Sequence, residues 1–287
     1  MPRGLDHIIH AVRDLDACAA LYERLGFIVG ARNRHDWGTH NRVVQLPGFF
    51  VELLTVAEPE KLGNDGLSQL FGAHNRDFLA RHEGLSGLLL ESRDAAADAA
   101  LFRDAGIAAS QVLRFGREGR RPDGTPIRLA FSLAFARDPT GAESAFAACQ
   151  HHFPENFWNP TFQQHRNGAT GVAGVVMVAE NPSDHHIFLS AFTGERELLA
   201  TSSGVTVQTP HGSIQVMEPS AYERHFGVAP PDLARGARLA ALIFAVRERA
   251  QVAALLVQAK IAATERMGRI VVGPQDAMGA TLVFEQS

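Results

Sequence analysis

The 287-residue chain is 46% hydrophobic and 20% charged, and it carries a formal net charge of -4, a profile typical of a globular protein of one or two domains. It contains no run of about 18 apolar residues that could span a membrane and no apolar N-terminal segment typical of a secretory signal. The arginines are dispersed among acidic residues, which argues against nucleic-acid binding. We therefore expect a cytoplasmic protein without membrane or nucleic-acid partners.

The chain opens with the pattern of a strand, a helix and three short strands. Apolar and polar residues alternate over residues 5–12, Asp14 follows as a helix N-cap, and Gly26 ends an apolar repeat of helical spacing. The stretches "FIVGARNRH", "HNRVVQL" and "FFVELLTV" then read as strands separated by turn residues. These elements predict one βαβββ unit.

The same order of elements returns three times. The later units begin at "GLSGLLLESRDAAADAALFRDAGI", "GVAGVVMVAENPSDHHIFLSAFTG" and "ARLAALIFAVRERAQVAALLVQAKI", and the second contains a predicted turn at Pro122, Asp123 and Gly124. Four copies of one unit explain nearly the whole chain. Residues 57–83 lie outside the units, and we expect their segment "LSQLFGAHNRDFLARH" to form a partial helical lid.

A second irregular segment, residues 151–170, is rich in histidine, asparagine and aromatic residues, unlike a plain flexible linker. We expect its part from Asn156 to Thr170 to lie against another part of the protein. The two cysteines, Cys18 and Cys149, are far apart in sequence and have no CxxC spacing, which predicts inert buried thiols.

Modules that open with "LDHIIHAVRDLDACAALYERLGF" resemble the vicinal oxygen chelate (VOC) superfamily, which includes glyoxalase I, fosfomycin resistance proteins and extradiol dioxygenases. The stretches "RHDWGTHNRVVQL" and "CQHHFPENFWNPTFQQHRNGATGV" resemble its glyoxalase-like domain proteins. The resemblance implies an α+β fold in which four βαβββ modules pair into two curved-sheet domains. It predicts an N-terminal pair over residues 1–150, a connector over residues 151–170 and a C-terminal pair over residues 171–287.

The resemblance further implies a divalent metal (Fe, Mn, Zn or Ni) in the cup of the N-terminal pair, held by His7 and Glu52. Strand alternation places His7 on one face with Ile9 and turns His10 to the opposite face. Glu52 shares its face with Phe50, and a carboxylate in such apolar surroundings is costly unless it is paired or metal-bound.

The third ligand is less constrained, because the second module has Ser86 or Gly87 where the first has His7. His151, at the end of that module's last strand, and His40 are the candidates. The competing interpretation is a site without metal, in which the histidines bind or protonate the substrate directly. In either case Glu52 and His40 are the expected proton-transferring residues.

Polar and aromatic residues of the first module, the second module and the connector are candidates for the substrate pocket. The alternative is that the aromatic members belong to the core and that His165 caps the start of the third module. The predicted substrate-binding residues are Trp37, Asn41, Phe50, Phe146, Trp158 and His165.

The C-terminal pair has no histidine on its first strands, "GVAGVVMV" and "RLAALIFAV", and only Glu218 and Glu285 near the acidic positions. An iron site of the extradiol type is therefore not predicted there. We expect this half to support a homodimer or to form an additional pocket wall. In its first helix, Asp184, His185 and His186 are expected to be solvated.

These residues favour a glyoxalase-like enzyme, a lyase, isomerase or dioxygenase, that acts on a small oxygenated organic molecule through divalent-metal chelation of vicinal oxygens. The alternative is a metal-independent protein of the same fold that binds or sequesters a small molecule. The incomplete ligand set favours the second, and the pairing of His7 with Glu52 favours the first.

Overall fold

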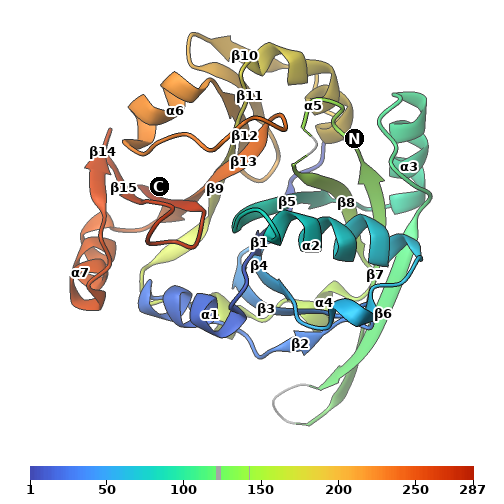
Figure 1. The fold of residues 1–287 in the computed structure, drawn as a ribbon. Helices are drawn as coiled ribbons and strands as arrows, with labels where there is room; N and C mark the ends of the chain where they lie inside the picture. Colours follow the sequence, from blue (N-terminus) through green and yellow to red (C-terminus); the bar gives the residue numbers. More distant parts are fainter. Residues whose placement is uncertain (121–123, 142) are drawn as a thin grey trace.

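The computed structural model describes residues 1–120, 124–141 and 143–287, so Pro122 and Asp123 of the predicted turn lie outside the described residues. The described chain is built around two eight-stranded sheets (Figure 1). No described helix combines the length and the hydropathy needed to cross a membrane.

The first sheet joins two βαβββ modules edge to edge. Its strand order is β2-β3-β4-β1-β5-β8-β7-β6, in which β1 is parallel to β4 and antiparallel to β5. The first module contains β1 (Leu5–Ala11), α1 (Leu15–Arg24), β2 (Asn33–Arg34), β3 (Thr39–Leu46) and β4 (Phe49–Val56). The second contains β5 (Gly84–Glu91), α3 (Ala95–Asp104), β6 (Leu113–Arg120), β7 (Pro126–Ala136) and β8 (Ala145–His151).

The second sheet repeats this arrangement with the order β10-β11-β12-β9-β13-β16-β15-β14. Its third module contains β9 (Ala169–Val178), η4 (Pro182–His185), α5 (His186–Thr193), β10 (Leu198–Thr201), β11 (Gly204–Gln208) and β12 (Ser213–Met217). The fourth contains β13 (Arg238–Val246), α7 (Arg249–Ala259), β14 (Thr264–Arg266), β15 (Arg269–Val272) and β16 (Thr281–Gln286). The predicted α+β fold of four modules in two curved sheets is confirmed.

The remaining short helices connect the modules. The predicted lid contains a π-helical segment, and the connector contains two short helical turns. These elements are η1 (Pro59–Lys61), η2 (Ser68–Ala73), α2 (His74–Leu79), α4 (Pro154–Phe157), η3 (Pro160–Gln163) and α6 (Pro219–Phe226).

The first helices of modules one and two begin at equivalent aspartates. Asp14 and Asp94 each accept hydrogen bonds from two backbone N–H groups of the following turn, which satisfies donors that have no partner inside the helix. Gly26 and Gly106, just after the two helices, both have positive φ, which glycine adopts without steric cost. The local signals of the repeat therefore act as the sequence predicts.

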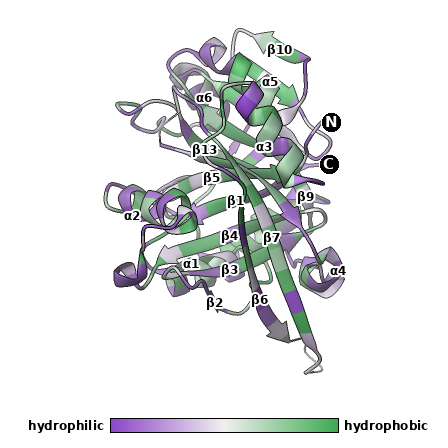
Figure 2. Ribbon diagram, turned by 90° about the vertical axis from the view of Figure 1, so that its right-hand side faces the viewer, coloured by the Kyte–Doolittle hydropathy of each residue, from purple (hydrophilic) through white to green (hydrophobic). Residues whose placement is uncertain are grey.

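The main hydrophobic core lies between the two sheets. One cluster joins the helix-covered faces of both sheets, and Phe27 at the end of the first helix region packs on Phe244 of β13 with ring centroids 4.8 Å apart. Figure 2 shows hydrophobic residues concentrated on the strands and hydrophilic residues toward the outer loops. The opposite, concave face of each sheet is called its cup.

Helix α5 belongs to the third module but covers the second. Phe188 packs on Phe146 of β8, and Phe192 packs on Phe102 of α3, with ring centroids 4.9 and 5.9 Å apart. Arg3 adds a hydrogen bond to the carbonyl oxygen of Phe192 at 2.9 Å. This packing places Phe146 in the core between the sheets, outside the cup to which the sequence analysis assigned it.

The cup of the second sheet is filled by the protein itself. Tyr222 and Phe226 of α6 are fully buried and pack in one hydrophobic cluster with Val176 of β9 and Ile243 of β13. The Tyr222 hydroxyl donates a hydrogen bond to Thr281 Oγ1 at 2.7 Å, so its polar end is satisfied. Hydrocarbon therefore takes the space that the equivalent cup of the first sheet leaves partly open.

The prediction that His185 is solvated is wrong. His185 is only 2% exposed, and its Nδ1 lies 2.6 Å from the carboxylate of Asp138, which follows β7 of the second module. The neighbouring His186 and Asp184 are exposed as predicted. The error arises because the partner that buries His185 comes from a distant part of the chain.

His10 also joins the two halves, from the helix-covered face of β1. Its Nε2 donates to the carbonyl oxygen of Met278 at 3.0 Å, and its Nδ1 accepts from the Tyr22 hydroxyl at 3.0 Å. Burial lowers the pKa of His10 from 6.5 to about 4, although the Met278 carbonyl and Glu83 act in the opposite direction. The folded protein therefore holds this ring neutral.

This shift predicts a loss of stability at mildly acidic pH. Because the folded pKa of His10 is about 4 and its ordinary value is 6.5, the unfolded chain binds more protons between these pH values. The contribution of His10 to the free energy of unfolding is fully present above pH 6.5 and decreases as the pH falls toward about 4. When the pH is lowered from 6.5 to about 4, we expect the free energy of unfolding to decrease in both proteins. The decrease in the wild type should exceed that in His10→Gln by up to about 3 kcal/mol.

Urea titrations of both proteins at several pH values, followed by circular dichroism, measure this difference. His10→Gln keeps a side chain that can donate to the Met278 carbonyl, so both proteins should fold. Parallel pH profiles for the wild type and the variant would contradict the assignment of the shift to His10.

Candidate active site

The cup of the first sheet encloses a cavity of about 60 Å³, well above the roughly 10–15 Å³ that one water molecule needs. His7 of β1 and Glu52 of β4 both line this cavity. Glu52 pairs in parallel register with Ile9, which lies two residues beyond His7 and therefore on the same face of β1, so both side chains lie on the cup face of the sheet. The walls are mainly aromatic and aliphatic. They comprise His7, His35, Trp37, Asn41, Val43, Phe50, Glu52, Leu67, Phe71, Leu89, Phe115, Arg117, Phe131, Leu133, Cys149 and Phe157.

A β-bulge at the start of β1 brings Asp6 beside His7. Leu5 pairs with Leu90 and His7 pairs with Leu89, so Asp6 is an extra residue in the strand. The carboxylate of Asp6 hydrogen-bonds His7 Nδ1, and its Oδ2 lies 3.0 Å from His151 Nε2 at the end of β8. One buried carboxylate therefore contacts an imidazole from each of the two modules.

This pairing sets the charge of Asp6. Burial alone would raise the pKa of Asp6, but the charge and hydrogen bond of His151 and those of His7 lower it well below its ordinary value. Asp6 is therefore ionised at neutral pH although its side chain is buried. Removing either imidazole would leave a buried charge with fewer partners, which is energetically costly.

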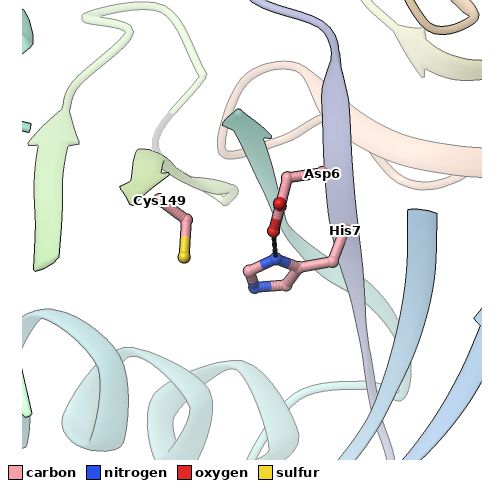
Figure 3. A group of neighbouring side chains, drawn as sticks. All are labelled: Asp6, His7 and Cys149. Atoms are coloured by element: carbon pink, nitrogen blue, oxygen red, sulfur yellow. Dashed lines mark hydrogen bonds and ion pairs between the residues drawn. The ribbon is translucent and has the colours of Figure 1, made fainter. Parts of the chain in front are cut away.

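The contact with Asp6 also orients the ring of His7. Because Nδ1 is occupied by Asp6, Nε2 is the ring nitrogen left for a ligand, and Figure 3 shows it on the side of the ring away from Asp6. The ring stacks on Phe50 with centroids 4.2 Å apart, which fixes its plane. A histidine held by a carboxylate in this way is suited to bind a metal ion or to exchange a proton.

Glu52 lies deep in the cavity wall and is 5% exposed. Asn41 of β3 donates a hydrogen bond from Nδ2 to Glu52 Oε1 at 2.5 Å. Burial raises the pKa of Glu52, although His7, the Asn41 hydrogen bond and Arg117 partly oppose this effect. A carboxyl group with a raised pKa is closer to the range in which it can both accept and release a proton near neutral pH.

The other wall of the cavity carries His35, Trp37 and Arg117. His35 stacks on Trp37 with centroids 4.5 Å apart, and its Nδ1 lies 2.8 Å from Thr39 Oγ1. Burial, together with the charges of Arg117 and His40, lowers the pKa of His35 to about 3, so the ring is neutral. Trp37 Nε1 is buried and has no hydrogen-bond partner among the described residues.

Metal-binding atoms are present around His7. One ligand atom each from Asp6, His7 and Cys149 lies within 4.8 Å of the other two (Figure 3). Burial, with the nearby charges of Asp6 and Glu52, raises the pKa of Cys149 well above its ordinary value, so the thiol is protonated as long as no cation is bound. This group of three residues offers the oxygen, nitrogen and sulfur ligands that divalent transition metals accept, whereas Glu52 lines the same cavity without belonging to the group.

The structure brings five of the predicted site residues to the cavity wall: His7, Trp37, Asn41, Phe50 and Glu52. It does not bring the other five there: they are His40, Phe146, His151, Trp158 and His165. His40 faces the other side of β3, where its Nε2 lies 2.7 Å from Glu58 Oε1.

Trp158, His165 and His151 lie behind the cavity wall. His165 donates from Nε2 to the carbonyl oxygen of Gln45 at 2.7 Å and accepts the backbone N–H of Ile28 at its Nδ1, so it ties the connector to the first module. Trp158 stacks on His151 with centroids 5.8 Å apart. The connector therefore packs against the module, and these three residues act on the cavity only through their neighbours.

The second module contributes no ligand at the positions equivalent to His7 and Glu52. In the repeat, Gly87 of the second module is equivalent to His7 of the first. Leu89 is equivalent to Ile9 and pairs with Ala147 of β8, so Ala147 occupies the position equivalent to Glu52. The chemistry of the cup therefore comes from one module and from residues outside the repeat pattern.

The polar residues Asp6, His35 and Arg117 were not predicted as part of the site, and Cys149 was expected to be an inert buried thiol. Asp6 depends on a bulge that has no local sequence signal. Arg117 had a usable signal, because Leu113, Phe115 and Arg117 alternate along β6 and put a charge on an apolar face.

No curated protein matches the sequence of this chain. Solved structures share its fold at low identity. A hypothetical protein from Staphylococcus aureus superposes with a TM-score of 0.70 at 12% identity, covering 100% of both chains. A mutant of 4-hydroxymandelate synthase from Streptomyces coelicolor gives a TM-score of 0.63 at 13% identity, covering 99% of this chain and 92% of the synthase.

A fusion of a xylose isomerase-like TIM barrel with 4-hydroxyphenylpyruvate dioxygenase gives a TM-score of 0.55 at 11% identity; the match covers 100% of this chain but 49% of the fusion protein. A family model, described as a glyoxalase-like domain, matches residues 5–193, which include both modules of the first sheet, the connector and helix α5. This match and the arrangement of βαβββ modules agree on one assignment: the chain belongs to the glyoxalase-like domain family, within the vicinal oxygen chelate superfamily.

Proposed function

We propose that the protein is an enzyme that binds a small oxygenated organic molecule in the cup of the first sheet and moves a proton on it. The observation that carries this proposal is the meeting of His7 and Glu52, from neighbouring strands, on one buried cavity. Two solved neighbours are named for small organic molecules, 4-hydroxymandelate and 4-hydroxyphenylpyruvate, which supports a ligand of that size class.

Each residue has a distinct role in this proposal. Glu52 accepts a proton from the carbon next to a carbonyl group and returns it, a task that fits its raised pKa. Asp6 and Phe50 fix the plane of His7, and Asn41 holds one oxygen of Glu52. A divalent cation held at the group of Asp6, His7 and Cys149 would supply a Lewis acid that stabilises negative charge on a substrate oxygen, which leaves Glu52 free to carry the proton.

The second candidate function is binding without catalysis. Gly87 and Ala147 stand where a second pair of ligands would be expected from the repeat, so the first module alone provides His7 and Glu52. Under this alternative the cavity binds a small molecule through its aromatic walls, and His7 and Glu52 form hydrogen bonds to it. The two candidates make different predictions for metal ions and for proton exchange.

Metal binding is tested by thermal unfolding of the purified protein with Mn, Fe, Zn or Ni ions. We expect at least one ion to raise the melting temperature, because a ligand at 100 times its Kd stabilises the folded state by about 2.7 kcal/mol. The rise should be lost in His7→Ala and strongly reduced in Cys149→Ala. His186→Ala, which removes an exposed histidine, should retain it and serves as the matched control.

A rise that persists unchanged in His7→Ala would place the ion elsewhere. A wild type that responds to small organic ligands and to none of the four ions would support the binding-protein alternative.

Proton transfer is tested by solvent deuterium incorporation, followed by proton NMR, into hydroxyacetone, dihydroxyacetone and pyruvate. We expect the wild type to accelerate exchange at carbon next to the carbonyl of at least one of these compounds. Loss of a positioned general base typically slows such a step by about 10²- to 10⁴-fold, and we expect a decrease of this order in Glu52→Gln.

Glu285→Gln is the control for this experiment, because Glu285 is a last-strand glutamate of the fourth module that pairs with Arg269 far from the first cup. Equal exchange rates for Glu52→Gln and the wild type would exclude Glu52 as the base.

A further inference from the structure

A second hollow lies directly outside the cavity. It has a volume of about 370 Å³ and shares Val43, Arg117 and Phe157 with the cavity wall. Its sides come from the first module, from the β6–β7 hairpin of the second module and from the connector. We call this hollow the vestibule, because it adjoins the cavity at these three shared residues.

Arg117 stands at the junction of the vestibule and the cavity. The sheet curls until β3 and β6, near its opposite ends, face each other across this junction, so Arg117 of β6 and Val43 of β3 line the same space. Leu113 and Phe115 precede Arg117 on the same face of β6, and in register Arg117 pairs with Leu129 of β7. The guanidinium group is therefore surrounded largely by apolar side chains.

Arg117 has no charge partner in direct contact. It is half-buried, and within residues 1–120, 124–141 and 143–287 no carboxylate lies close enough to form an ion pair with it. Among the described residues that line the vestibule, Arg117 is the single charged side chain. Among those that line the cavity, the acid is Glu52, whose carboxylate already accepts a hydrogen bond from Asn41.

A partly buried guanidinium without a partner is costly, and an anion that supplies oxygen acceptors removes the cost. A guanidinium offers a planar fork of donors that matches a carboxylate in a bidentate arrangement. Trp37 Nε1, a buried donor with no partner in the described part of the chain, adds to the hydrogen-bond donors around the cavity.

We propose that Arg117 binds the carboxylate of the substrate, so that the site selects small organic acids whose carboxylate rests at the junction while an adjacent oxygenated carbon reaches His7 and Glu52. This inference rests on the proposed function, because it assumes that the first cup is the reaction site. It adds a specificity-determining residue from the second module, which otherwise contributes apolar wall and Cys149.

The test compares each acid with its neutral amide of nearly equal shape: glycolate with glycolamide, lactate with lactamide, and mandelate with mandelamide. Binding to the full-length protein is measured by calorimetry for the wild type, Arg117→Gln, Arg117→Lys and Arg114→Gln. Arg114 lies on the same strand but lines neither the cavity nor the vestibule, so it is a matched control. Inorganic phosphate is included as a competing anion.

We expect at least one acid to bind the wild type about 10- to 100-fold more tightly than its amide, the range of charge-assisted hydrogen bonds. The preference should fall to within about threefold in Arg117→Gln, persist in part in Arg117→Lys and remain unchanged in Arg114→Gln. Equal binding of acids and amides to the wild type overturns the inference without any variant. So does a preference that survives Arg117→Gln, or tighter binding of phosphate than of every acid.

The metal-dependent rise in melting temperature, measured on Arg117→Gln, separates this inference from the proposed function. An intact rise together with a lost acid preference supports both. An intact rise with no acid preference in the wild type overturns the inference alone. An acid preference in a protein that shows neither a metal response nor proton exchange overturns the proposed catalysis and leaves Arg117 as the acid-binding residue of a binding protein.

Discussion

The interaction on which the site depends is the buried carboxylate of Asp6 between two imidazoles. His7 comes from the first strand of the first module and His151 from the last strand of the second, so the contact joins modules that are otherwise linked through strand pairing. Because the Asp6 carboxylate is buried away from water, it is stable only with both imidazoles close to it. The same contact determines which nitrogen of His7 faces a ligand.

A repeated fold does not produce a repeated site here. All four modules keep the βαβββ order, yet the first cup has a cavity with polar groups and the second cup is filled by Tyr222 and Phe226. Within the first cup, the second module replaces a histidine by Gly87 and contributes Arg117 from a different strand. The same backbone arrangement can therefore carry different side chains in its two cups.

The sequence predicted what depends on local pattern. Strand alternation correctly separated His7 from His10, and the repeat identified the modules and the aspartate caps of their helices. It did not predict contacts that depend on distant partners. Asp6 faces the cup because of a bulge against β5, and His185 is buried because Asp138 lies beside it in space. Aromatic residues were the least predictable, because core and pocket walls have the same composition.

The packing of α5 explains where the matched family region ends. That region stops at Thr193, the last residue of α5, after one strand and one helix of the second sheet. Without Phe188 and Phe192, the outer side of the second module would expose Phe102 and Phe146 to water. The matched region therefore ends where the hydrophobic surface of the second module is fully covered, rather than at the end of a sheet.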